Sequence, residues 1–143
     1  MLSFSSYINE VRLVLGRKSN GEKAEAFLKD FHADSQEHPF HHSARILHNA
    51  VVHLSKDGNE VHMHDIQSVA PRSGAGTKAL NHLTNLADKH GVKINLYAKA
   101  YSNSPDHIRS TGKLMKWYKK NGFQHEEPYP DEREGSDMKY YPR

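Results

Sequence analysis

The central part of the chain arranges its apolar residues in an order that predicts strand, turn, helix and strand. Glu60 to Ser68 reads as a strand, and Pro71 to Thr77 forms a glycine-containing turn. Apolar residues then recur at helical spacing to about His90, where Gly91 suits a left-handed helix end. Val92 to Ala98 reads as the next strand. This order predicts two parallel strands joined by a right-handed crossover.

Similar patterns predict the remaining elements. An N-terminal helix, capped by Ser5 or Ser6, is expected with an apolar face of Tyr7, Ile8, Val11, Val14 and Leu15. Further helices are expected over Glu22–Phe31 and Lys113–Asn121, and further strands over Arg45–Ser55, Phe123–Glu126 and Met138–Tyr141. Asp57-Gly58-Asn59 predicts a hairpin turn, because a tight reversal needs positive φ. Loops without a period are expected over His32–Ser43, Tyr101–Arg109 and Pro128–Gly135.

These elements predict an α+β (mixed α/β) fold with a central mixed sheet flanked by about four helices. The 143 residues contain no internal repeat, so one domain over residues 1–143 is expected. The turn lacks the three glycines of a dinucleotide-binding strand–helix turn and has no acidic residue closing the second strand. It also lacks the Gly-Lys-Ser/Thr ending of a phosphate-binding P-loop. Both classes are therefore excluded.

Composition limits the chemistry, the cellular location and the partners that can be expected. The absence of cysteine excludes disulfides and a covalent acyl-cysteine intermediate. No apolar run approaches the roughly 20 residues of a membrane span, and the first residues lack a secretory signal pattern, so a cytoplasmic protein without a membrane partner is expected. A net charge of +3 without a base-stacking motif does not favour a nucleic-acid partner.

The glycine turn is the first candidate binding site. A glycine-rich turn that opens a helix presents backbone N–H groups without partners and the positive end of the helix dipole. Such a turn can hold a phosphate or pyrophosphate, and glycine lets the anion approach closely. The backbone from Arg72 to Thr77 is the predicted binding site for the phosphate group. Thr77 could add a hydroxyl to this site, and Arg72 and Lys78 could add positive charge. The alternative is an ordinary tight turn between strand and helix.

Two motifs flank the second strand of this unit. Gly74-Ala75-Gly76 matches the end of the pattern Gln/Arg-x-x-Gly-x-Gly/Ala, although Pro71 stands at its first position. Downstream, Leu114-Met-Lys-Trp-Tyr118-Lys-Lys-Asn-Gly122-Phe123 matches Leu-x-x-Phe-Tyr-x-x-x-Gly-Phe. In this order and spacing they resemble the GCN5-related N-acetyltransferase (GNAT) superfamily, over roughly residues 45 to 143. The compact C-terminal half resembles small bacteriophage-type members, including acetyltransferases that inactivate CRISPR nucleases.

The resemblance implies acetyl-CoA as co-substrate and direct transfer of its acetyl group to a primary amine, on a protein lysine or a small molecule. It implies that the turn binds the pyrophosphate and that the end of the first strand, from His64 to Ser68, pairs with the amide arm of the cofactor. The implied cofactor contacts are Ile66, Gln67, Ser68, Arg72, Ser73, Gly74, Ala75, Gly76, Thr77 and Asn103.

Tyr118 is the candidate general acid that the resemblance implies, because a phenol can protonate the departing CoA thiolate. The alternative is a core aromatic residue beside Trp117. Candidate bases are Glu60, His62 and His64, which the period of two places on one strand face, with Asp65 on the opposite face. His62 and His64 have suitable intrinsic pKa values, whereas the resemblance favours a carboxylate such as Glu60. The choice among the three stays open, and all of them could be polar surface groups.

Twelve histidines raise a metal hypothesis, with ligand-like spacing at His38, His41 and His42 and at His62 and His64. A zinc site usually needs three or four convergent ligands, often with cysteine, and no recognisable pattern is present, so no metal is expected. Two alternative functions remain: a non-catalytic acyl-CoA-binding or protein-interaction module on the same fold, and a basic domain that binds nucleic acid or protein without a cofactor. Either a monomer or a homodimer is compatible with the sequence.

Overall fold

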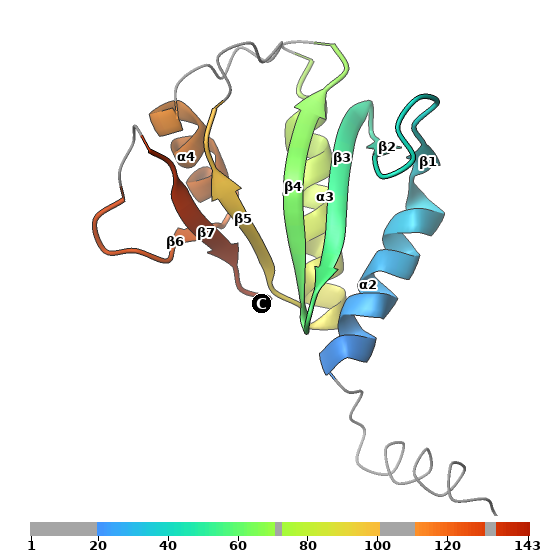
Figure 1. Ribbon diagram of the computed structural model, residues 1–143, viewed down its shortest axis with the longest axis horizontal. Coiled ribbons are helices and arrows are strands. Elements are labelled where there is room, and N and C mark those ends of the chain that lie inside the picture. The colour runs from blue at the N-terminus through green and yellow to red at the C-terminus, as the bar shows by residue number, and fades with distance from the viewer. Residues whose placement is uncertain (1–19, 71–72, 101–110, 131–133) are drawn as a thin grey trace, which may run out of the picture.

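The computed structural model describes residues 20–70, 73–100, 111–130 and 134–143 (Figure 1). The expected N-terminal helix lies outside them. The described elements are α2 (Asn20–Asp34), β1 (Gln36–Glu37), β2 (Arg45–Leu47), β3 (Ala50–Asp57), β4 (Glu60–Ser68), α3 (Ala75–His90), β5 (Ile94–Ala98), α4 (Thr111–Lys120), β6 (Gln124–His125) and β7 (Ser136–Tyr140). The mixed α+β fold is confirmed at this level, with three helices in the described residues where about four were expected for the whole chain.

One seven-stranded sheet organises the molecule, with the strand order β1-β2-β3-β4-β5-β7-β6. Every neighbouring pair is antiparallel except β4 and β5, which run parallel. The predicted parallel pair is thus confirmed, and α3 is the crossover between its two strands (Figure 1). The last hairpin adds its second strand, β7, directly to β5, so β6 becomes the edge.

The core lies between the sheet and the helices. Helix α2 buries Phe27 and Phe31, and α3 buries Leu80 and Leu83 against the strands. Helices α2 and α3 also contact each other, and Asp30 of α2 accepts hydrogen bonds from Lys89 and His90 of α3. These two hydrogen bonds hold the pKa of the Asp30 carboxyl below its usual value. The two helices are therefore joined by apolar packing and by the hydrogen bonds to Asp30.

The predicted strand over Arg45–Ser55 is wrong in one respect: it is two strands. Residues His48 and Asn49 adopt positive φ values of 51° and 62° and reverse the chain, so that Leu47 of β2 pairs with Ala50 of β3. Asparagine tolerates this left-handed conformation better than most residues, whereas histidine gives a weaker signal. The turn therefore had little local signature among the flanking apolar residues.

Other boundaries differ by smaller amounts. The loop expected over His32–Ser43 is shorter, because α2 continues to Asp34 and β1 follows it. Strand β7 begins at Ser136, two residues before the predicted start, while α4 begins at Thr111 and β5 at Ile94. The hairpin turn is confirmed, since Asp57 pairs with Glu60 across it, and so is the helix end at Gly91, which has a φ of 65°.

Strand β4 contains a bulge that the period-two pattern did not predict. His53 of β3 pairs with Asp65, but the next residue of β3 pairs with Met63, so His64 is an extra residue in β4. Burial follows the same shift: Val61 and Met63 are buried before the bulge and Ile66 after it. Asp65 is exposed and directly precedes the buried Ile66, so it lies on the same face as His62. The prediction that Asp65 lies on the opposite face is therefore wrong.

Candidate functional site

Strands β4 and β5 pair over only three residues and then separate. The pairs are Val61 with Ile94, His62 with Asn95, and Met63 with Leu96. Beyond them, β4 continues to Ser68 paired with β3, and β5 continues to Ala98 paired with β7, while the residues that the structure describes form no further pair between the two (Figure 1). The bulge at His64 falls where the pairing stops, and a bulge bends its strand.

The glycine turn lies just after the open stretch of β4. Gly74, with a φ of 77°, precedes the first residue of α3, and the first helical hydrogen bond runs from Lys78 N to Gly74 O. The amides of residues 75–77 precede that bond and have no acceptor within the helix. In the structure, Ser73 Oγ accepts from Ala75 N at 3.3 Å and Ser68 Oγ from Gly76 N at 3.0 Å. Two amides are therefore bound by hydroxyl oxygens, which phosphate oxygens could replace.

Helix α4 contacts the first turn of α3 through Trp117. Trp117 Nε1 donates a 3.0 Å hydrogen bond to Thr77 Oγ1, and a Cβ added at Gly76 would lie 3.2 Å from Ser68 Oγ and 3.7 Å from the Trp117 ring. The absence of a side chain at Gly76 therefore serves this close packing as well as any ligand. The Thr77 hydroxyl, a predicted cofactor contact, is a partner of Trp117.

Tyr118 is buried in the core, with 6% of its surface exposed. Its ring centroid lies 4.9 Å from that of Trp117 and 5.4 Å from that of Phe123. The downstream motif is therefore one packed aromatic unit, which attaches α4 beside the N-terminus of α3 through Trp117. This burial and ring packing agree with the alternative of a core aromatic residue.

Three histidines gather at the bulge, on the open face of the sheet. The His64 ring centroid lies 4.6 Å from that of His53 and 4.5 Å from that of His62, and His64 Nε2 lies 2.7 Å from Ser55 Oγ. Burial, and then the charges of His62 and His53, lower the pKa of His64 below its ordinary value of 6.5. Its imidazole is therefore mostly neutral at pH 7 and can accept a proton. Sequence reasoning missed His53, which the hairpin register places on this face.

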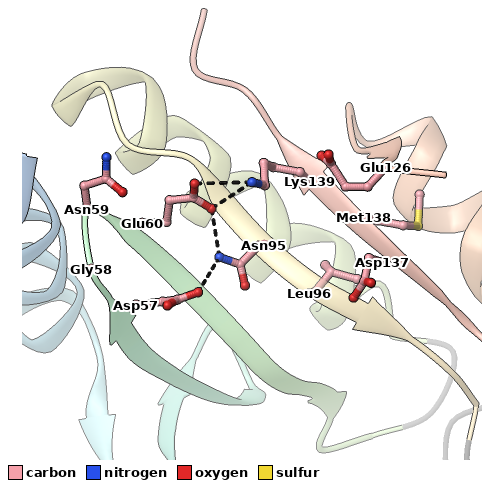
Figure 2. A pocket seen from close by; sticks show the side chains of 10 residues that line it. All are labelled: Asp57, Gly58, Asn59, Glu60, Asn95, Leu96, Glu126, Asp137, Met138 and Lys139. Atoms are coloured by element: carbon pink, nitrogen blue, oxygen red, sulfur yellow. Dashed lines mark hydrogen bonds and ion pairs between the residues drawn. The ribbon is translucent and has the colours of Figure 1, made fainter.

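Glu60 lies in a different environment. Its carboxylate forms an ion pair with Lys139 of β7 at 3.1 Å and accepts a hydrogen bond from Asn95 Nδ2 at 2.9 Å (Figure 2). Asn95 also donates to Asp57 Oδ2 at 3.0 Å, and its Oδ1 contacts His62 Nδ1. The structure thus connects Glu60 to His62 through Asn95, whereas His64 lies nearest the point where the strands separate. Asn95, Asp57 and Lys139 were not predicted, because β5 and β7 supply two of them from distant sequence.

A pocket of about 550 Å³ opens at the hairpin end of this network (Figure 2). Its lining comprises Asp57, Gly58, Asn59, Glu60, Asn95, Leu96, Glu126, Asp137, Met138 and Lys139. Four carboxylates against one ammonium give the pocket an acidic lining. It adjoins the start of β4, while the glycine turn follows the end of β4, so pocket and turn lie at opposite ends of one strand.

Some expected site residues lie outside the described residues, namely Arg72 and Asn103. Within the described ranges no three histidine, aspartate or glutamate side chains are grouped so that they could hold a metal ion. Among the helices that the structure describes, none has the length and apolarity needed to cross a membrane.

Comparison with known proteins gives a structural likeness that bears on the fold. No protein-family model matches the sequence, and no curated protein matches it. The fold resembles that of the anti-CRISPR protein AcrVA5. The crystal structure of that protein matches with a TM-score of 0.51 and 22% sequence identity, over 66% of this chain and 92% of the other. At this identity the likeness extends to the fold alone.

Proposed function

We propose that the chain is an acetyl-CoA-dependent N-acetyltransferase of the GNAT type, acting on a primary amine. The observation that carries this proposal is the separation of β4 and β5 at the His64 bulge, directly before the glycine turn that opens α3. A parallel pair that opens in this way leaves a backbone edge free for an extended ligand, and a helix N-terminus at the end of that edge favours an anion. Coenzyme A offers both, as an amide arm ending in a pyrophosphate.

In this proposal the two parts of the coenzyme meet two parts of the chain. The backbone from Ile66 to Ser68, including Gln67, pairs with the amide arm, while the amides from Ser73 to Thr77 hold the pyrophosphate. Ser68 and Ser73, whose hydroxyls now accept from the amides of Gly76 and Ala75, rotate away or bind the phosphate themselves. Arg72 and Asn103, which the resemblance adds as cofactor contacts, lie outside the described residues.

The chemistry needs one base, one acid and close approach. A lysine-like amine is almost entirely protonated at pH 7, because its pKa is near 10.4. His64 accepts that proton, and the neutral amine nitrogen attacks the thioester carbonyl. The C–S bond breaks as Tyr118 protonates the leaving sulfur, and the extra proton on the amide nitrogen is lost to solvent, from which the Tyr118 phenolate is reprotonated. Holding amine and thioester together contributes most, about 7–11 kcal/mol for well-oriented reactants. Glu60, paired with Lys139, supports the site through Asn95 instead of acting as the base.

The acidic lining of the pocket is the basis on which we propose the chemical class of the acetyl acceptor. Four carboxylates in the pocket favour a cation, and an amine approaches a protein as a cation. A protein lysine and a small amine both meet this condition. The likeness to an anti-CRISPR protein and the resemblance to phage-type acetyltransferases favour a protein acceptor, with a CRISPR nuclease as the first to test.

Calorimetric titration with acetyl-CoA tests whether the glycine turn binds the cofactor. We expect binding by the wild-type chain and loss of binding in Gly74→Trp, because an indole beside the first turn of α3 occupies the space of the pyrophosphate. Asn85→Trp, on the exposed side of the same helix, is the matched control and should bind normally. Retained acetyl-CoA affinity in Gly74→Trp would show that the turn is not the cofactor-binding site. Binding followed by no thiol release with any amine or protein would favour the non-catalytic module.

Tyr118→Phe tests the general acid. Removing one hydroxyl should lower kcat by about 10²–10⁴-fold, the usual contribution of a positioned acid, with the acetyl-CoA Kd unchanged. Thiol release measured with a saturating amine gives kcat, and titration gives Kd. Tyr129→Phe, at a residue with 90% exposure, is the control. Unchanged turnover in Tyr118→Phe would leave Tyr118 with a packing role only.

A further inference from the structure

Asn95 is the centre of the polar network on the open face of the sheet. It belongs to the middle of the three pairs that join β5 to β4, where its partner is His62. Its side chain reaches three groups: Nδ2 donates to Asp57 Oδ2 at 3.0 Å and to Glu60 Oε1 at 2.9 Å, and Oδ1 contacts His62 Nδ1. Figure 2 shows the two carboxylates converging on the amide nitrogen.

The two carboxylates decide which way the amide faces. An ionised carboxylate only accepts hydrogen bonds, whereas an amide NH₂ group has two N–H donors. Asp57 and Glu60 take one N–H each, so the amide oxygen must face His62. Turning the amide over would place its oxygen against two carboxylate oxygens. Lys139 holds Glu60 in place, and this ion pair is only about one-fifth exposed on each side.

The orientation of the amide in turn decides which tautomer the neutral His62 ring adopts. A carbonyl oxygen only accepts, so the His62 Nδ1 beside it must carry a hydrogen. A neutral imidazole carries one N–H, so Nε2 of that ring is its acceptor. The carboxylates thus act on the imidazole through an amide, as an orienting carboxylate does in hydrolase triads.

We propose that Asn95 is a positioning residue that fixes His62 as its Nδ1–H tautomer and holds the ring edge-on to His64. The planes of the two rings meet at 82°, which places His62 against the residue at the end of the β4–β5 pairing. Its role in acetyl transfer rests on the function proposed above, whereas the tautomer does not. Around the two rings, β3 supplies His53 and Ser55.

Nuclear magnetic resonance of the imidazole nitrogens tests the tautomer on the full chain without any ligand. We expect the His62 signals, assigned by their loss in His62→Gln, to show that the neutral ring carries its hydrogen on Nδ1 and none on Nε2. Asn95→Leu should release the ring into a mixture of tautomers, whereas Asn95→Gln, which keeps the amide donors and the oxygen acceptor, should retain the proton on Nδ1. Asn85→Leu, on exposed α3 surface, should leave the signals unchanged. An Nε2–H tautomer in the wild-type chain would overturn the inference, and this outcome requires only the assignment variant His62→Gln to fold.

Steady-state kinetics test the proposed role of Asn95 in acetyl transfer. Asn95→Leu should lower kcat for acetyl transfer about tenfold, the lower end of the effect of removing an orienting partner from a functional histidine, with the acetyl-CoA Kd unchanged. Asn95→Gln, which keeps the amide, should recover part of the loss. If the wild-type chain transfers no acetyl group, the proposed function and the catalytic role of Asn95 are both wrong, and the tautomer measurement still decides whether Asn95 positions His62. An unchanged kcat in Asn95→Leu, beside a changed tautomer, would reject the catalytic role alone.

Discussion

His64→Gln is expected to lower kcat for acetyl transfer by about 10²–10⁴-fold, with little change in the affinity for acetyl-CoA. The physical reason is the position of His64 at the bulge, where β4 leaves β5, together with a pKa that burial and two neighbouring imidazoles hold below 6.5. Glutamine keeps a polar group beside Ser55 but cannot accept a proton at neutral pH. Steady-state thiol release and calorimetric titration measure the two quantities separately.

The pH profile sharpens this prediction. A base acts in its unprotonated form, so a lowered pKa keeps the wild-type enzyme active to more acidic pH, and the acid limb attributable to His64 should lie below pH 6.5. That limb should be absent from the residual rate of His64→Gln. His42→Gln, at an exposed histidine outside the cluster, should behave like the wild type. A wild-type turnover in His64→Gln would return the role of base to His62 or Glu60.

Phe123→Ala is expected to lower the free energy of unfolding by about 3–5 kcal/mol, a large part of the roughly 5–15 kcal/mol of a typical domain. Phe123 is 1% exposed and packs between the rings of Tyr118 and Tyr140, at centroid distances of 5.4 Å and 5.6 Å. Its removal leaves a cavity between the end of α4 and β7. Denaturant unfolding followed by circular dichroism measures the change.

Phe40→Ala provides the matched control, since the same side chain is removed at a residue with 83% exposure. Its free energy of unfolding should stay within about 0.5 kcal/mol of the wild type. A loss in Phe123→Ala as small as that in Phe40→Ala would contradict the core role of Phe123. Because Phe123 belongs to the same aromatic unit as Tyr118, Phe123→Ala should also reduce turnover in the fraction that remains folded.

Local signals accounted for much of the fold. The turn at Asp57-Gly58-Asn59 and the helix end at Gly91 were predicted because each depends on a residue that adopts positive φ within a few positions. The parallel β4–β5 pair followed from the order of strand, helix and strand. The turn at His48 and Asn49 was missed, because the apolar residues on both sides read as one continuous strand.

The candidate site was predicted less completely. His62 and His64 were singled out by their spacing on one strand, and the structure brings them together with His53 across the hairpin. The bulge that places His64 at the strand separation arises from the register between two strands, so no single-strand period reveals it. It also moves Asp65 to the other face from the one predicted.

The sequence by itself determined most of the elements, the parallel unit around the glycine turn and the identity of the titratable groups, because these depend on residues close together in the chain. The tertiary structure alone decided which of those groups meet. Asn95 and Lys139 reach Glu60 from β5 and β7, strands that follow it by 35 and 79 positions along the chain. Contacts over such separations depend on strand order and register, and these are set by the packing of the whole sheet rather than by any local pattern.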